Sequence, residues 1–182
     1  MIFRETTFQL KDGRNAVLRS PCESDAEEML GYIVRASGET DFLVHYPEEY
    51  SGMSVVREEK WINARISSPY ALPICCVLEG KIVGMCELRF NSAIKASHRV
   101  SLAITVQKAY WSLGIGSFMF EEMIAAASRR GAEIMELEFV EGNDRARRLY
   151  EKFGFRVVSE KPNAFKLKDG RYLGEFYMQK YL

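Results

Sequence analysis

Apolar and polar residues follow one another along the first half of the chain in patterns that predict a hairpin and two helices. Residues 8–19 form two short extended segments about a central turn. Apolar residues at helical spacing predict one helix over about 24–38 and a second over 54–66. Residues 39–52, between these helices, combine aromatic and acidic side chains without a clear period. We expect a loop there, which either shapes a substrate pocket or is a solvated connector.

The second half of the chain predicts strands interrupted by two helices. The expected strands cover residues 74–78, 81–90, 100–106, 134–140, 155–159, 164–167 and 172–179. The expected helices cover residues 116–130 and 143–152. Because no internal repeat or low-complexity segment interrupts this series, we expect a single domain over residues 1–182.

One stretch of this half has the order strand, glycine loop, helix. The strand over 100–106 is followed by a loop with Gly114 and Gly116, and a helix leaves the loop. This order directs free backbone N–H groups and the positive end of a helix dipole at one point, which suits a phosphate. A dinucleotide fingerprint needs a third glycine where Met119 stands, and the Gly-Lys-Ser/Thr of a P-loop is absent. Taken alone, the two glycines could also serve only to relieve strain in a turn.

The amino-acid composition limits the kinds of binding partner and the cellular location that we expect. The 182 residues are 47% apolar and 27% charged, and 25 basic residues balance 25 acidic ones. A zero net charge gives no general attraction to nucleic acid, so we expect no nucleic-acid partner. No apolar run approaches the roughly 20 residues that span a bilayer. Arg4 and Glu5 interrupt the apolar residues at the amino end, so we expect no signal peptide and no membrane partner, and a cytoplasmic location.

The cysteine and histidine residues form no zinc-binding pattern. There is no C-x-x-C pair, and the two histidines stand far apart in the sequence. We therefore expect no metal site and four reduced thiols, with the two adjacent cysteines packed in a strand as small hydrophobes. The residues concerned are Cys22, Cys75, Cys76, Cys86, His45 and His98.

The surroundings of the glycine loop resemble the acetyl-CoA motif of the GCN5-related N-acetyltransferase (GNAT) superfamily. In that family a strand ends in Val or a similar residue, and [Q/R]-x-x-G-x-[G/A] then opens a helix. Here Val106 is followed by Trp111-Ser-Leu-Gly-Ile-Gly116, so both glycines match. Trp111 replaces the usual Gln or Arg and Ser112 the common Gly, which affects one side-chain contact and leaves the backbone amides in place.

A second match lies downstream at the family spacing. Residues 143–155 are similar to the family segment N-x-x-A-x-x-L-Y-x-x-x-G-F. The matching residues are Asn143, Ala146, Leu149, Tyr150, Gly154 and Phe155. Residues 169–178 also resemble the closing hairpin of the family, so the likeness covers about the last hundred residues.

The resemblance implies a fold and an activity. The fold is α+β, a three-layer α/β arrangement in which a mixed, mostly antiparallel twisted sheet is flanked by helices and its central strand pair is splayed. The activity is transfer of an acetyl group from acetyl-CoA to a primary amine of a small molecule or peptide, by direct attack in a ternary complex. A non-catalytic module that binds or senses acetyl-CoA is the alternative. The resemblance is also compatible with a homodimer, although nothing in this sequence demonstrates one.

The resemblance also implies which residues hold acetyl-CoA. The pantetheine arm can pair with the strand edge at Ile104 to Val106, and the N–H of Val106 is the expected donor to the thioester carbonyl. Asn143 contacts the cofactor arm, caps the following helix, or does both. The pyrophosphate is expected at the N–H groups of Trp111, Ser112, Leu113, Gly114, Ile115, Gly116 and Ser117.

Catalysis needs an acid for the leaving thiolate and a base for the amine. Tyr150 matches the family tyrosine that acts as the acid. The alternative is that it is only a core tyrosine of an amphipathic helix. Glu138 matches the base of some family members that acetylate protein amino termini, and Glu87 is a carboxylate in the middle of a strand. His98 is a weaker candidate. Val100 stands where histone-acetylating members have a glutamate, which counts against that mechanism.

Overall fold

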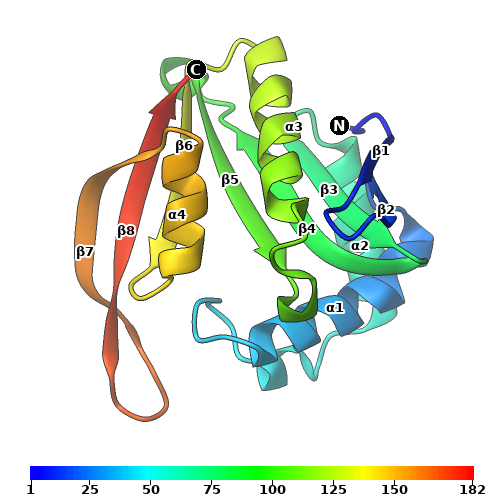
Figure 1. Cartoon of the computed structure of the whole chain (residues 1–182), viewed down its shortest axis with the longest axis horizontal. Coiled ribbons are helices and arrows are strands. Elements are labelled where there is room, and N and C mark those ends of the chain that lie inside the picture. The colour runs from blue at the N-terminus through cyan, green and yellow to red at the C-terminus, as the bar shows by residue number, and fades with distance from the viewer.

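The computed structural model describes residues 1–182 and places eight strands in one sheet, in the order β1-β2-β3-β4-β5-β6-β8-β7 (Figure 1). The strands are β1 (Thr6–Gln9), β2 (Asn15–Arg19), β3 (Ala71–Leu78), β4 (Lys81–Phe90), β5 (Arg99–Val106), β6 (Ile134–Val140), β7 (Arg156–Lys166) and β8 (Tyr172–Tyr181). The helices are α1 (Ala26–Gly38), α2 (Val55–Ser67), α3 (Ile115–Arg129) and α4 (Asp144–Lys152). The elements therefore follow the order and type that the residue pattern predicts. None of the helices is long and apolar enough to span a bilayer.

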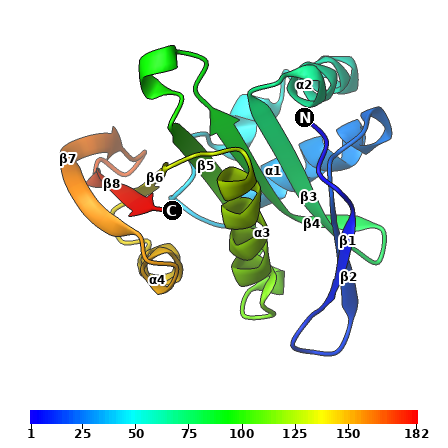
Figure 2. The same ribbon diagram turned by 90° about the horizontal axis from the view of Figure 1, so that it is seen from above.

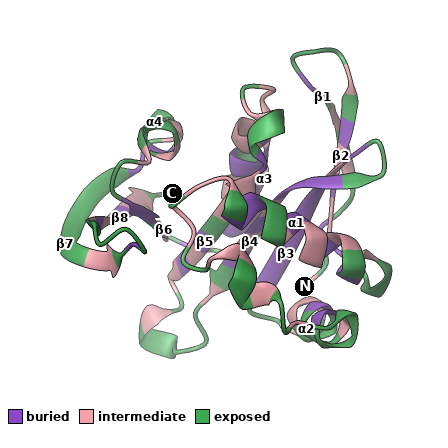
Figure 3. Ribbon diagram, turned by 90° about the horizontal axis from the view of Figure 1, so that it is seen from below, coloured by how far each residue is buried: buried purple, intermediate pink, exposed green.

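Helices cover both faces of the sheet. Figure 2 shows α3 and α4 on one face and α1 and α2 on the other. Each face has its own buried cluster, the larger one under α3 and α4 and the smaller one under α1 and α2 (Figure 3). The adjacent Cys75 and Cys76 belong to different clusters because successive side chains of a strand point to opposite faces. Both thiols are free, as expected of small hydrophobes in a strand.

The sheet is antiparallel except where β5 and β6 meet. These two strands are parallel and pair only over Arg99–Ser101 and Ile134–Glu136. Beyond Ser101 they diverge (Figure 1), so residues 102–106 of β5 have a strand partner only on the β4 side. This confirms the three-layer α/β fold and its splayed central strand pair.

Two strands differ from the prediction. The expected strands over 155–159 and 164–167 are one strand, β7, with a register shift between Val157 and Ser159 and a second, between Lys161 and Phe165, that contains Pro162-Asn163. That dipeptide is typical of a turn, but β7 is an edge strand, where a proline and an irregular register are tolerated. β3 begins at Ala71 rather than at residue 74. The carbonyl and the nitrogen of one strand residue face the same side, and the Pro73 carbonyl accepts a hydrogen bond from Ser20, just past the end of β2. The proline nitrogen therefore faces a side where the β2–β3 ladder has already ended, and no ladder bond is lost.

Candidate active site

A cleft of about 760 Å³ follows the gap between β5 and β6. Its walls come from β4, β5, β6, the start of α3, α4 and the loop between α1 and α2. The predicted site residues that line it are Glu87, Ile104, Val106, Trp111, Ser112, Gly114, Ile115, Gly116, Ser117, Glu138, Asn143 and Tyr150. Among the residues predicted to hold acetyl-CoA, Leu113 alone lies outside the lining, and its carbonyl accepts a hydrogen bond of 3.1 Å from the Lys11 amide. The structure therefore gathers almost all of the predicted residues around one space.

The edge of β5 that faces the gap has free backbone groups. The Gln107 amide donates to the Val83 carbonyl at 3.0 Å, on the β4 side. Backbone groups of an antiparallel strand alternate between its two sides, so those of Ile104 and Val106 face the gap. The Val106 carbonyl accepts a hydrogen bond of 2.7 Å from the Trp111 indole, and no strand pairs with its amide. The amides of Ile104 and Val106 are thus available to a ligand.

The loop before α3 approaches the same gap. Ser112 and Gly114 have positive φ angles of 65° and 97°, and α3 begins at Ile115. A Cβ atom on Gly116 would lie 3.1 Å from Cδ2 of Leu149, so the glycine allows α4 to pack closely on the first turn of α3. The first-turn amides of α3 have no intrahelical acceptor and form an anion-binding end next to the free strand edge.

Four basic residues that the sequence motifs did not predict line the cleft around this end of α3: Lys11, Arg145, Arg148 and Lys152. The Arg145 guanidinium lies 4.7 Å from the Trp111 ring centroid and donates to Ser112 Oγ at 3.4 Å. Lys152 Nζ donates to Ser117 Oγ at 3.1 Å, and Lys11 also lines the cleft. Arg145 and Lys152 are seven residues apart on the predicted helix, a spacing that places them on one face. That periodicity is the signal that could have found them.

Tyr150 is buried among aromatic side chains and its hydroxyl has no hydrogen-bond partner within the protein. The residue is 6% exposed, and its ring lies 5.5 Å from that of Phe120 and 5.8 Å from that of Phe139. Burial raises the pKa of Tyr150 to about 12. A protonated hydroxyl therefore lines the cleft in a largely apolar setting, where it can donate a hydrogen bond to a ligand.

Asn143 caps α4. Its side-chain oxygen accepts a hydrogen bond of 3.2 Å from the Ala146 amide, at the first turn of the helix. The side chain also lines the cleft, so the cap leaves its amide group in reach of a ligand. The N-cap prediction is confirmed, and the contact with a cofactor stays a prediction.

Two carboxylates flank Ala103 on the α1/α2 face of the sheet. Glu87 on β4 is the cross-strand partner of Ala103. On the other side of Ala103 lies β6, whose last pair with β5 is Ser101 with Glu136. Glu138, two residues further along β6, therefore lies across the gap from Ala103. The small side chain of Ala103 leaves room between the two acids. His98, before β5, does not line the cleft.

The two acids differ in their surroundings. Arg65 donates a hydrogen bond of 3.2 Å to Glu87, and Arg89 lies 3.8 Å from the same carboxylate. Burial raises the pKa of Glu87, and the two guanidinium groups act in the opposite direction. Glu138 is exposed to the cleft and forms no ion pair or side-chain hydrogen bond. Glu138 is therefore the carboxylate with both oxygens free.

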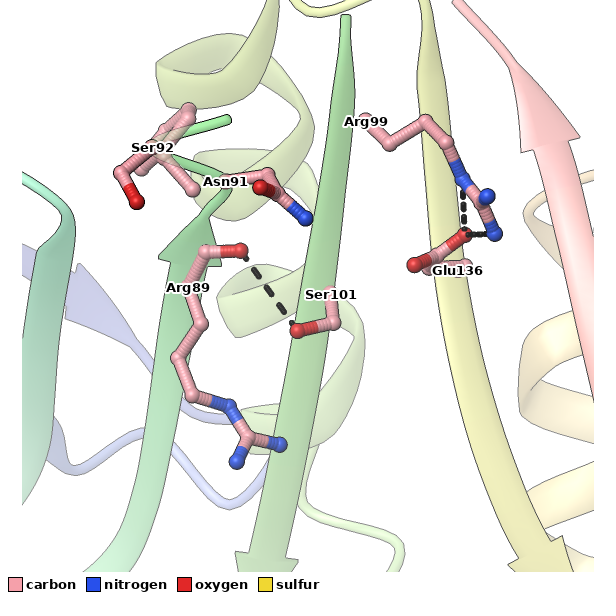
Figure 4. Close-up of a pocket in the computed structure, with 7 residues that line it drawn as sticks. Arg89, Asn91, Ser92, Arg99, Ser101 and Glu136 are labelled. Carbon is pink, nitrogen blue, oxygen red and sulfur yellow. Dashed lines mark hydrogen bonds and ion pairs between the residues drawn. The ribbon is translucent and has the colours of Figure 1, made fainter. Parts of the chain in front are cut away.

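A polar hollow of about 300 Å³ lies beside the closed end of the splay (Figure 4). Arg89, Ser101, Arg99 and Glu136 line it, and Arg99 Nε donates to Glu136 at 2.8 Å. Tyr177 also donates to Glu136 through its hydroxyl. This cluster joins β5, β6 and β8 where the parallel ladder ends, so it fixes the point from which the two strands diverge.

Comparison with known proteins identifies relatives of this architecture. The family model "Acetyltransferase (GNAT) family" matches residues 36–155. A GNAT-family acetyltransferase from Streptococcus pneumoniae is 26% identical, with a TM-score of 0.84 and coverage of 92% of this chain and 99% of that one. Comparison with curated protein sequences found no match.

Two further solved structures share the fold. YncA from Salmonella typhimurium, solved with its cofactor acetyl-CoA, is 21% identical with a TM-score of 0.77, and 92% of this chain and 94% of that one are covered. A ribosomal-protein-alanine N-acetyltransferase from Brucella melitensis is 23% identical with a TM-score of 0.76, and 91% and 99% are covered. Because the family model matches more than half of its residues, the chain belongs to the GNAT family of acetyltransferases.

Proposed function

We propose that the protein is an N-acetyltransferase that moves the acetyl group of acetyl-CoA to a primary amine of a small molecule or peptide. One observation carries the proposal. The unpartnered hydroxyl of Tyr150 lines the same cleft as the free edge of β5 and the start of α3. A module that only binds acetyl-CoA needs the edge and the helix end, but it has no need of a buried proton donor beside them.

The residues of the cleft fit acetyl-CoA. The amides of Ile104 and Val106 can pair with the amide-rich pantetheine arm, as an added strand would. The first-turn amides of α3 can bind the pyrophosphate, and Arg145 and Lys152 add positive charge beside them. YncA, which shares the fold, was solved with acetyl-CoA, and this supports the same ligand here.

When bound, acetyl-CoA supplies an acetyl group already activated as a thioester. We place the reacting amine over Ala103, between the two carboxylates, where it can attack the thioester carbonyl directly. The Val106 amide donates to the carbonyl oxygen as negative charge develops there. The new C–N bond forms, the C–S bond breaks, and Tyr150 gives its proton to the departing sulfur. The amine nitrogen gives one proton to a base, so atoms and charges balance.

We assign the base to Glu138. Both of its oxygens are free, whereas Arg65 and Arg89 hold Glu87. An amine can approach either oxygen of Glu138 directly, whereas at Glu87 it would have to displace a guanidinium group. Glu87 then contributes by neutralising the charges of Arg65 and Arg89 beside the cleft. We also place the enzyme in the cytoplasm, because its four free thiols suit a reducing compartment.

The test is to incubate the protein with acetyl-CoA and a panel of amines while free thiol is measured. We expect thiol release that depends on the amine. Thermal melting with and without acetyl-CoA runs in parallel, since a ligand that binds the native state raises the melting temperature. If no amine in the panel causes thiol release while acetyl-CoA still raises the melting temperature, the protein is instead a binding or sensing module.

A further inference from the structure

The loop between α1 and α2 crosses the open end of the β5–β6 gap (Figure 1). At its start, Glu39 accepts a hydrogen bond of 2.7 Å from the Lys108 amide, just after β5. The ring of Phe42 then packs against Gly142, in the loop after β6, at 3.7 Å from the position of a Cβ atom there. The loop is thus fixed to both sides of the splay.

The far part of the same loop is fixed to the β7–β8 hairpin. Lys168 forms an ion pair with Glu48, and its amide donates to the Tyr46 hydroxyl at 3.2 Å. Its ammonium also lies 4.1 Å from the Tyr46 ring centroid. Arg171 lies 3.5 Å from Asp41. Residues 39–50 therefore form a strap that covers the α1/α2 side of the cleft, and the space under it suits a small acceptor better than a site on a folded protein.

Apolar side chains line the space under the strap. Phe42, Leu43 and Val44 come from the strap, Phe165 from β7 and Trp61 from α2. Such walls favour an acceptor with a hydrocarbon segment, because they remove apolar surface from water.

A second free carboxylate, Glu175, lies beyond Glu138 on the same face. Glu138 and Tyr177 are cross-strand partners, and so are Val140 and Glu175. Glu138 and Glu175 are therefore diagonal neighbours that line the cleft, and neither forms an ion pair. Lys161, the partner of Glu175 on β7, is exposed and forms no ion pair with it. The Tyr150 hydroxyl, also without a hydrogen-bond partner in the protein, lines the same cleft from the other side of the sheet.

The two free acids cannot both be satisfied by the reacting nitrogen. An amine must lose its positive charge before it attacks a carbonyl. A carboxylate that bound the cationic form then has no positive partner. If Glu138 takes that proton, the neutral nitrogen no longer balances the negative charge of Glu175, which is left for a second cationic group. Resting on the proposed function, we propose that the acceptor is a small dication: a diamine whose hydrocarbon segment lies under the strap, with its second ammonium held by Glu175.

The reaction consumes acetyl-CoA and one diamine dication and yields CoA thiol, a monoacetylated amine with one positive charge, and one proton. The reacting ammonium loses two protons: Glu138 takes one and passes it to solvent, and the other balances the proton that Tyr150 gives to the sulfur. The second ammonium group stays protonated and unchanged. Arg89 offers the opposite charge at the β4 side of the cleft and would suit an amino acid, whose carboxylate it could bind. Arg89 already lies near Glu87, whereas Glu175 has no such partner, and this difference favours the dication.

Three probes that differ only at the far end test the proposal: 1,5-diaminopentane, pentylamine and 5-aminopentanoate. We expect kcat/KM for the diamine to exceed that for pentylamine by about tenfold, as one charge-assisted hydrogen bond allows. The amino acid should be the poorest of the three. Glu175→Gln should bring the diamine down to the pentylamine value and leave pentylamine unchanged. Glu121→Gln, an exposed residue of α3, is the matched control and should change neither.

Binding is measured separately, by calorimetric titration of 1,5-diaminopentane into the protein with CoA. We expect about tenfold weaker binding to Glu175→Gln than to the wild type. Equal kcat/KM for the diamine and pentylamine would overturn the dication proposal, as would a preference for 5-aminopentanoate or for a short peptide with amino-terminal alanine. Any of these results would leave the N-acetyltransferase assignment standing. That assignment fails only if no amine releases thiol.

Discussion

The indole nitrogen of Trp111 donates a hydrogen bond of 2.7 Å to the backbone carbonyl of Val106. This bond ties the loop before α3 to the edge of β5, while Arg145 packs on the indole ring. The family motif usually has Gln or Arg at this position. In this chain the aromatic residue fixes the loop, and Arg145 of α4 brings the positive charge. The loop before α3 and the free strand edge are therefore held in one geometry by a side chain that departs from the family pattern.

Trp111→Phe removes the hydrogen bond and keeps a ring for Arg145. We expect acetyl-CoA to bind about fivefold more weakly, since a net hydrogen bond is worth about 1 kcal/mol. Isothermal titration measures the affinity, and Trp61→Phe on α2 is the control that should leave it unchanged. An unaltered affinity for Trp111→Phe would mean that the bond does not position the loop.

Arg145→Ala should weaken acetyl-CoA binding by about tenfold, because a guanidinium beside a phosphate forms charge-assisted hydrogen bonds. The loss should shrink as salt is raised from 50 to about 500 mM, since salt screens exposed charges. Arg147→Ala is the matched control, because Arg147 lies on the same helix, pairs with Glu151 and does not line the cleft. Equal effects of the two substitutions would show that only the general charge of α4 matters.

Much of the fold could be predicted because its signals are local. Alternating apolar residues identify β5 and β6, and the glycines mark the start of α3. The helix that carries Tyr150 is likewise predicted by the spacing of its apolar residues together with its N-cap and terminal glycine. These are features of short windows, and the structure confirms the elements they predict.

The contacts that complete the cleft join distant parts of the chain and leave no local signal. Glu48 and Lys168, which hold the strap, are 120 residues apart. The aromatic and acidic residues of 39–52 could equally belong to a solvated connector until the β7–β8 hairpin is placed beside them. The proline within β7 misleads in the opposite way, because only its position at the edge of the sheet allows the strand to continue through it.

Tyr150→Phe should lower kcat by about a hundredfold, the usual contribution of a positioned acid, with little change in acetyl-CoA affinity. Because burial raises the pKa of Tyr150 to about 12, the hydroxyl stays protonated at neutral and mildly alkaline pH. The wild-type kcat should therefore show no alkaline fall that belongs to this residue below about pH 10. Stopped-assay kinetics from pH 6 to 10 check both points, and parallel losses in kcat and affinity would contradict the acid role.

The general base is identified by the pH dependence of kcat, which reports the bound complex. A base must lose its proton to act, so the rate rises as pH increases through its pKa. Glu138→Gln should lower kcat about a hundredfold and abolish this rise. Glu87→Gln should keep the rise, because its carboxylate is held by Arg65. If only Glu87→Gln abolishes the rise, the two acids have exchanged roles.

Buried thiols make the fold sensitive to alkali. Burial raises the pKa of Cys75 and of Cys76 to about 12, and that of Cys86 well above its usual range. A raised pKa means that the folded protein keeps its proton after the unfolded chain has lost it. The buried, protonated thiols therefore stabilise the folded protein fully below about pH 9, and this stabilisation declines as pH rises towards the pKa of the folded state. Each thiol should lower the free energy of unfolding by about 1.4 kcal/mol per pH unit in that window.

Urea unfolding under reducing conditions at pH 8.0 to 10.5 measures this slope. Cys76→Ala should unfold more easily than the wild type at pH 8, because it leaves a small cavity in the core. Its stability should nevertheless fall less steeply with pH, since one buried thiol no longer ionises on unfolding. Cys22→Ala, at an exposed position, is the control and should keep the wild-type slope. The slope is the informative quantity, because packing changes the stability by the same amount at every pH and only an ionising group changes its pH dependence. A wild-type slope in Cys76→Ala would show that this thiol is hydrated in the folded protein, against its complete burial between the sheet and α3.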